Sequence, residues 1–126
     1  MANQPLTGLA RLWAAFQNSV QGFRDIWRME EAFRMEVGLF VLSLPLAYVV
    51  AETLFQAAIL AGSVILILIV EVLNSAIEAV IDRIGAERHE LSRIAKDLGS
   101  LAVLLSLVLA GVLWAAAVFE ALVNRF

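Results

Sequence analysis

The chain of 126 residues is 62% apolar and carries a formal net charge of −3, with no cysteine and one histidine. Soluble domains are roughly 45–50% apolar, so the composition predicts an integral membrane protein with one domain over 1–126. It excludes a disulfide framework, a cysteine-based metal site and a site of several histidines. The N-terminus lacks the segments of a signal peptide, and we expect Met1 to Phe126 to be close to the mature protein.

Residues 6–28 are predicted to form an amphipathic helix. Apolar side chains recur there at alternating spacings of three and four, while the arginines fall elsewhere. The apolar set consists of Leu6, Leu9, Trp13, Phe16, Val20, Phe23 and Trp27. This pattern is typical of a helix that lies in the lipid headgroup layer; a helix packed on protein is the alternative.

The first apolar run, 37–51, holds 15 uncharged residues and follows a charged segment at 30–36. A helix that starts inside that charged segment reaches about 20 residues, the length that spans a bilayer. We therefore predict a first span over 32–51. Pro45 lies inside it, and membrane helices tolerate proline.

Residues 53–70 form a second uncharged run, and the helical pattern continues through residue 84. A helix over 53–84 would be about 48 Å long at 1.5 Å per residue, against a hydrocarbon core of about 30 Å. Glu71 would then lie about 27 Å from the start of the helix, near the far interface. It avoids the bilayer centre, where an acid costs about 2.5–3.5 kcal/mol.

The end of this helix carries an acidic face. Glu71, Asn74, Glu78 and Asp82 are spaced by three, four and four residues, which places them on one side. Carboxylates suit Mg²⁺, which proteins usually hold with one or two carboxylates and the substrate's phosphates. A nucleotide and a lipid hydroxyl would therefore fit here, with Glu71 accepting the hydroxyl proton. The structural alternatives are ion pairs of Glu78 and Asp82 with arginines, and helix–helix contact through Asn74.

The third apolar run, 98–119, has 22 uncharged residues and is the clearest span in the chain. We predict a helix over 92–122, after a helix stop at Gly85. Its first turns carry a phosphate-binding cation next to acids. The residues that share this face are Arg93, Lys96, Asp97 and Ser100.

The orientation follows from the placement of lysine and arginine. These residues gather before the first span and between the second and third, and only Arg125 follows the third. The positive-inside rule then predicts a cytoplasmic N-terminus and second-to-third loop, with the C-terminus outside. The residues concerned are Arg11, Arg24, Arg28, Arg34, Arg83, Arg88, Arg93 and Lys96.

The chain has no phosphate-binding glycine loop and no protein-kinase motif. Its residues alone indicate a membrane protein with an interfacial acidic site. They leave open a small proton-coupled transporter with Glu71 as its carrier acid, and a structural subunit without activity. A transporter site is expected near the bilayer midplane, and the helix length places Glu71 away from it.

The run EVLNSAIEAVIDRIG, followed by HELSRIAKDLGSLAV, closely resembles the signature of the prokaryotic diacylglycerol kinase family. RLWAAF and EEAFRMEVG near the N-terminus extend the resemblance over nearly the whole chain. It implies an all-α homotrimeric bundle with one surface helix and three transmembrane helices per subunit. It also implies a bacterial inner-membrane enzyme without a nucleic-acid partner, which transfers the γ-phosphoryl group of MgATP to diacylglycerol at sites shared between subunits. A related enzyme phosphorylates undecaprenol, and the core motif does not separate the two.

The resemblance also implies roles for individual residues. Glu71 falls on the general base, with the catalytic Asn74 beside it, and Glu30 and Glu78 fall on the metal ligands. Implied ATP contacts are Arg11, Asn18, Glu30, Glu78, Glu87, Arg88, His89, Lys96 and Asp97. Implied lipid contacts are Ser19, Trp27, Phe33, Arg34, Glu36, Glu71, Ser100 and Trp114. Three positions depart from the family pattern, namely Asn18 for tyrosine, Ala14 for lysine and Met35 for a polar residue.

Overall fold

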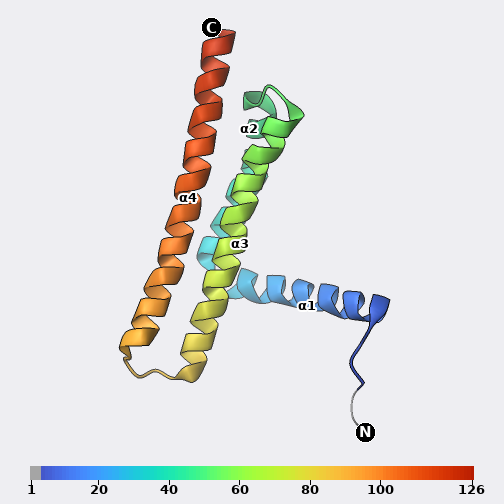
Figure 1. The fold of residues 1–126 in the computed structure, drawn as a ribbon, viewed down its shortest axis with the longest axis vertical. Helices are drawn as coiled ribbons and strands as arrows, with labels where there is room; N and C mark the ends of the chain where they lie inside the picture. The colour runs from blue at the N-terminus through green and yellow to red at the C-terminus, as the bar shows by residue number, and fades with distance from the viewer. Residues whose placement is uncertain (1–3) are drawn as a thin grey trace.

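The computed structural model describes residues 4–126 as four α-helices, with no strand in that range. The helices are α1 (Gly8–Met29), α2 (Glu31–Val50), α3 (Leu54–Ile84) and α4 (Glu90–Arg125). In Figure 1, α2, α3 and α4 run along one another as an up-and-down bundle, and α1 projects sideways from its lower half. The predicted all-α class with three long apolar helices is confirmed.

The bundle is organised around α3, which packs on α2 and on α4, whereas α2 and α4 touch each other only weakly. Its side chains Leu60, Val64 and Ile67 are only 1–3% exposed. Three buried serines donate their hydroxyl hydrogens to backbone carbonyls three residues earlier. These bonds matter because a polar group without a partner is costly in the hydrocarbon layer.

The ends of α3 and α4 have identifiable local causes. Thr53 begins α3 by accepting a hydrogen bond from the N–H of Gln56 at 3.1 Å, and His89 begins α4 by accepting one through Nδ1 from the N–H of Leu91 at 3.1 Å. Helix α3 ends at Gly85, whose φ of 155° is readily adopted only by glycine. A loop of five residues, 85–89, therefore separates the two longest helices.

The corner between α1 and α2 consists of a single non-helical residue, Glu30, with φ −113° and ψ 107°. The Arg34 guanidinium donates through Nη1 to the Trp27 carbonyl at 2.6 Å. The rings of Phe23 and Phe33 meet edge to face, with centroids 5.7 Å apart. These contacts fix the direction in which α1 leaves the bundle.

The three apolar helices differ in length, with 20, 31 and 36 residues. At 1.5 Å per residue, α2 is about 30 Å, α3 about 46 Å and α4 about 54 Å long, so only α2 matches a hydrocarbon core of about 30 Å. Helices α3 and α4 continue past the level at which α1 leaves α2 (Figure 1). Helix α4 covers 90–125 rather than the expected 92–122, because His89 caps it at an earlier residue.

Most large apolar side chains of the bundle are exposed, among them Tyr48, Leu54 and Phe55 at 74–88%. A water-soluble protein rarely leaves so much contiguous apolar surface uncovered. Lipid chains or further protein copies suit these faces. The chain is a multi-pass membrane protein with three candidate spans.

Candidate functional site

Glu71 is the one charged side chain that is buried among residues 4–126, with 5% of its surface exposed. It lies 17 residues into α3, about 26 Å from the start of the helix. None of the ion pairs in the described part of the chain involves it. A buried carboxylate without a cation is costly, and such groups are characteristic of functional sites.

Three further acids lie close enough for their charges to act on Glu71. Glu30 comes from the α1–α2 corner, Glu36 from α2 and Glu78 from the next turns of α3. We refer to these four residues as the carboxylate group. No member forms an ion pair within residues 4–126, and Glu36 Oε2 is buried without a hydrogen-bond partner. Four carboxyl groups without a cationic partner favour a cation as ligand.

The carboxylate group does not form a complete metal cage. No three His, Asp or Glu residues within 4–126 lie close enough together to hold a metal ion. Mg²⁺ is usually held by one or two carboxylates together with water and substrate phosphates. The donor set therefore fits an ion that arrives with a phosphorylated substrate, and Glu30 and Glu78 supply oxygen ligands of the required type.

On the side of α3 that faces α4, Asn74 packs against Gly99. The Asn74 carbonyl oxygen Oδ1 and the neighbouring Ser75 hydroxyl are buried and have no hydrogen-bond partner. Gly99 itself is buried. Asn74 lies one helical turn from Glu71, so this polar contact adjoins the carboxylate group.

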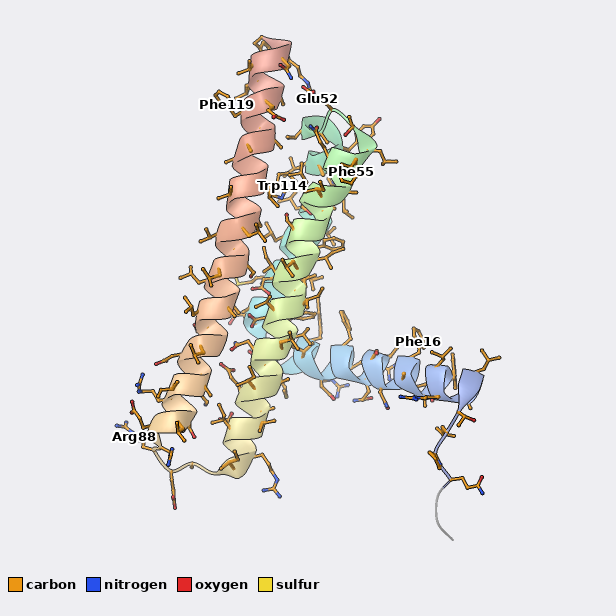
Figure 2. All side chains as sticks on the ribbon, in the orientation of Figure 1. Phe16, Glu52, Phe55, Arg88, Trp114 and Phe119 are labelled. Atoms are coloured by element: carbon orange, nitrogen blue, oxygen red, sulfur yellow. The ribbon has the colours of Figure 1, made fainter. Side chains whose placement is uncertain are left out.

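A polar cleft of about 590 Å³ lies between the end of α3 and the start of α4. Its walls include four residues with implied ATP contacts, namely Glu87, Arg88, His89 and Lys96. Figure 2 shows Arg88 at this end of the bundle, far from Glu52 and Phe119 at the opposite end. The cleft gathers cationic side chains at one end of the bundle. The positive-inside rule predicts that this end is cytoplasmic.

Some of the charged residues around this cleft are paired with one another. Lys96 Nζ lies 2.8 Å from Asp82 Oδ1 and joins α4 to α3. Arg93 lies 2.5 Å from Glu90 and 2.6 Å from Asp97. The structural alternative of an ion pair holds for Asp82 with Lys96 and not with an arginine, because the register of the two helices brings Lys96 to it. A phosphate that binds Lys96 has to compete with the Asp82 carboxylate.

Two of the implied ATP contacts lie far from the carboxylate group of their own chain. Arg11 and Asn18 are exposed on α1, about 28 Å and 18 Å along the helix from the Glu30 corner. Helix α1 extends sideways from the bundle, and Figure 2 shows Phe16 well out along it. One chain alone does not bring these side chains to Glu71.

The implied lipid contacts fall into separate places. Trp27, Phe33, Arg34 and Glu36 gather at the α1–α2 corner, where Phe33 is buried at 4% exposure and Arg34 bonds the Trp27 carbonyl. Ser19 lies farther out on α1, and its hydroxyl donates to the Ala15 carbonyl at 3.0 Å. The corner therefore gathers four of the implied lipid contacts, of which Glu36 belongs to the carboxylate group.

The remaining two lipid contacts belong to α4. Ser100 is exposed next to Gly99, and Trp114 lies about 21 Å farther along the helix. Trp114 lines an apolar groove of about 220 Å³ between α2, α3 and α4, and its Nε1 is buried without a partner. Figure 2 shows Trp114 in the upper half of the bundle, far from Arg88 at the other end.

Comparison with known proteins identifies the family. Residues 17–118 match the family model described as prokaryotic diacylglycerol kinase. The chain is 46% identical over 114 residues to a diacylglycerol kinase of Escherichia coli, which covers 90% of this chain and 93% of that protein. It is 42% identical over 113 residues to a diacylglycerol kinase of Haemophilus influenzae, which covers 90% of this chain and 96% of that protein. The enzyme of the same name from Pseudomonas aeruginosa is 44% identical over 109 residues, which covers 86% and 89% of the two chains. The chain therefore belongs to the prokaryotic diacylglycerol kinase family.

Proposed function

We propose that this protein transfers the γ-phosphoryl group of ATP to the hydroxyl of diacylglycerol, giving phosphatidic acid and ADP. Family membership supports the activity, because the similar relatives are all named diacylglycerol kinase. The observation that carries the choice of site is the buried, unpaired Glu71 among three further acids. Its position near the end of the hydrocarbon layer suits a lipid alcohol, whose hydroxyl lies at that depth while its chains stay in the bilayer.

In this proposal the hydroxyl of diacylglycerol gives its proton to the Glu71 carboxylate as its oxygen attacks the γ-phosphorus. The bond between that phosphorus and the β–γ bridging oxygen breaks, and ADP leaves. Phosphoryl transfer needs little covalent chemistry from the protein beyond positioning, charge neutralisation and a base. Asn74, one turn away, orients the reacting groups through its amide.

The neighbouring acids hold the nucleotide indirectly. A carboxylate repels a triphosphate, so Glu30 and Glu78 act as ligands of a magnesium ion that binds together with ATP. When bound, that ion neutralises phosphate charge. Lys96 supplies a direct cationic contact and exchanges its partner Asp82 for a phosphate oxygen.

The nucleotide itself fits along the cytosolic half of α3. About 16 Å separate Asp82, at the cleft, from Glu71 along the helix axis, and Glu78 lies between them. A nucleotide with its base at the cleft and its phosphates toward Glu71 would meet the proposed contact residues in order. Those residues are Glu87, Arg88, His89, Lys96, Asp97, Glu78 and Glu30.

A homotrimer with shared sites accounts for the remaining contacts. Arg11 and Asn18 lie about 18–28 Å along α1 from the corner of their own chain, so they would serve the site of a neighbouring copy. Neighbouring copies in such an assembly would also cover apolar faces that the single chain leaves exposed. Asn18 and Ala14, which depart from the family pattern, lie on this helix and leave the carboxylate group unaltered.

We place the enzyme in the bacterial inner membrane, with its N-terminus and the α3–α4 loop in the cytoplasm and its C-terminus in the periplasm. This orientation gives the nucleotide cleft access to cytosolic ATP. Diacylglycerol would reach Glu71 from the bilayer past Trp27, Phe33, Arg34 and Glu36 at the corner. The proposed lipid contacts away from the corner are Ser19, Ser100 and Trp114.

The choice of lipid is tested with the purified full-length protein, MgATP and either diacylglycerol or undecaprenol in parallel micelles. We expect phosphatidic acid from the first and no phosphorylated product from the second. Glu71→Gln serves as the matched control for contaminating kinases. Turnover of undecaprenol alone by the wild type would overturn the proposed substrate, and equal activity of Glu71→Gln would overturn the proposed base.

A further inference from the structure

Among the glycines of the described chain, Gly99 is the one that lies in close contact with a neighbouring helix. A Cβ atom built on Gly99 would overlap Asn74 Oδ1 and would lie 3.2 Å from Asn74 Cγ. Gly99 is buried, and the amide of Asn74 fills the space that any other side chain would occupy. The absence of a side chain at position 99 is therefore a condition for the observed position of Asn74.

The backbone does not require glycine at this position. Gly99 lies inside α4 and is not among the residues with positive φ, and alanine is the better helix former there. The other glycines within the helices have open space around a Cβ built on them, with no contact within 4 Å; they are Gly8, Gly22, Gly38, Gly62 and Gly111. The contact with Asn74 is what distinguishes Gly99.

The contact also orients the Asn74 amide. Its oxygen occupies the direction in which Gly99 carries a Cα hydrogen, a weak contact that recurs at helix–helix interfaces. It accepts no N–H or O–H hydrogen bond. Since the two polar atoms of an amide diverge from Cγ, placing Oδ1 on Gly99 turns the NH₂ group away from α4. Of the two polar atoms of the amide, the donor is therefore the one that α4 leaves free.

We propose that Gly99 is a positioning residue, which admits the Asn74 oxygen against α4 and so directs the Asn74 NH₂ group toward the reacting groups beside Glu71. This inference rests on the proposed function for its kinetic consequence. The contact itself is independent of the reaction. Gly99 is neither a member of the carboxylate group nor a lining residue of the nucleotide cleft.

Gly99→Ala is expected to fold, because the atom that must yield is the end of a short, rotatable side chain and not backbone. The new methyl group displaces the Asn74 amide. We expect kcat to fall by roughly tenfold or more, while KM for ATP and for diacylglycerol changes by less than about threefold, as for a group that acts on the reacting atoms. Gly62→Ala, in α3 with open space around its Cβ, is the matched control and should retain wild-type kcat.

A double-mutant cycle separates positioning from general packing. In the Asn74→Ala background, Gly99→Ala should lower kcat by no more than about twofold, because the group on which it acts is already absent. The same cycle by thermal denaturation reports on the contact without any turnover. Gly99→Ala should raise the unfolding midpoint more in the Asn74→Ala background than in the wild type, because the methyl group then fills vacant space.

Equal losses of kcat in the two backgrounds would overturn the inference, as would a Gly99→Ala enzyme with wild-type kcat. Equal changes of the unfolding midpoint in both backgrounds would show that the two residues do not interact and would overturn it independently. A wild-type protein that phosphorylates no lipid would instead refute the proposed function, and the thermal cycle would still decide whether Gly99 sets the position of Asn74.

Discussion

Replacing Glu71 by glutamine should inactivate this protein and stabilise it at the same time. Glutamine keeps the size and polarity of the side chain but removes the negative charge and the capacity to take a proton. Glu71 is 5% exposed, pairs with no cation in the described chain, and is subject to the charges of Glu30, Glu36 and Glu78. The native residue is therefore costly to the fold, and its replacement relieves repulsion.

Both magnitudes can be bounded. A positioned general base contributes about 10²–10⁴ in rate, so kcat should fall by that factor, equivalent to about 2.7–5.4 kcal/mol. At an effective dielectric constant of about 20, each like-charge pair of this kind contributes roughly 1–3 kcal/mol. Glu71 has three such neighbours, so removing its charge should raise the free energy of unfolding by at least about 1 kcal/mol, as found when functional strain is removed.

The two quantities are measured on the same detergent preparations of wild type and Glu71→Gln. Initial rates with saturating MgATP and diacylglycerol give kcat, and thermal denaturation followed by circular dichroism gives the unfolding midpoint. A lower kcat with a higher midpoint agrees with a base held among like charges. A variant with near-native kcat would refute the assignment of the base, and a lower midpoint would refute the repulsion between the four acids.

Three further substitutions probe other parts of the structure. Lys96→Met should raise KM for ATP by about tenfold or more, because a proposed phosphate contact is lost. It should change the free energy of unfolding by less than about 1 kcal/mol, because the ion pair of Lys96 with Asp82 is solvent-exposed. An unchanged KM in steady-state titrations would exclude Lys96 from the nucleotide site. Mixed oligomers of inactive Arg11→Ala and Glu71→Gln chains should recover about a quarter of the native sites if each site draws on two copies, and no recovery after reassembly would place the site within one chain. Asn124→Ala removes the 2.6 Å hydrogen bond to Glu52 at the opposite end; denaturation should show a loss of about 0.5–1.5 kcal/mol with native kcat, and a large loss of activity would contradict the location of the site.

The three long helices are largely predictable because uncharged runs mark them, and α1 is predictable from the spacing of its apolar residues. The distance of Glu71 from its helix start follows from counting residues. The sequence also shows that Glu71, Asn74 and Glu78 share a face, since that depends only on the helical repeat. What it cannot show is which residue of α4 meets which residue of α3. The Asp82–Lys96 pair spans 14 positions across a loop, and its existence depends on interhelical register.

Other features of the structure cannot be predicted from the sequence for related reasons. The cap formed by His89 depends on one side-chain rotamer at the start of α4. The distance of Arg11 from the carboxylate group depends on the direction that the single residue Glu30 gives to α1. Gly99 resembles any helical glycine in the sequence, and only the facing position of Asn74 distinguishes it. Signals of this kind arise between elements and not within them.

The most direct test follows label from ATP to lipid. Wild-type protein in mixed micelles is incubated with ATP labelled in the γ-phosphate and with diacylglycerol, with Mg²⁺ or with excess chelator, and the lipid fraction is counted. We predict labelled phosphatidic acid with Mg²⁺ only, and a rate of labelling lower by about 10²–10⁴ from Glu71→Gln with Mg²⁺. Label that stays in the aqueous phase with the wild type, or that enters the lipid equally well with the chelator, would contradict phosphoryl transfer to diacylglycerol at a magnesium-dependent carboxylate site.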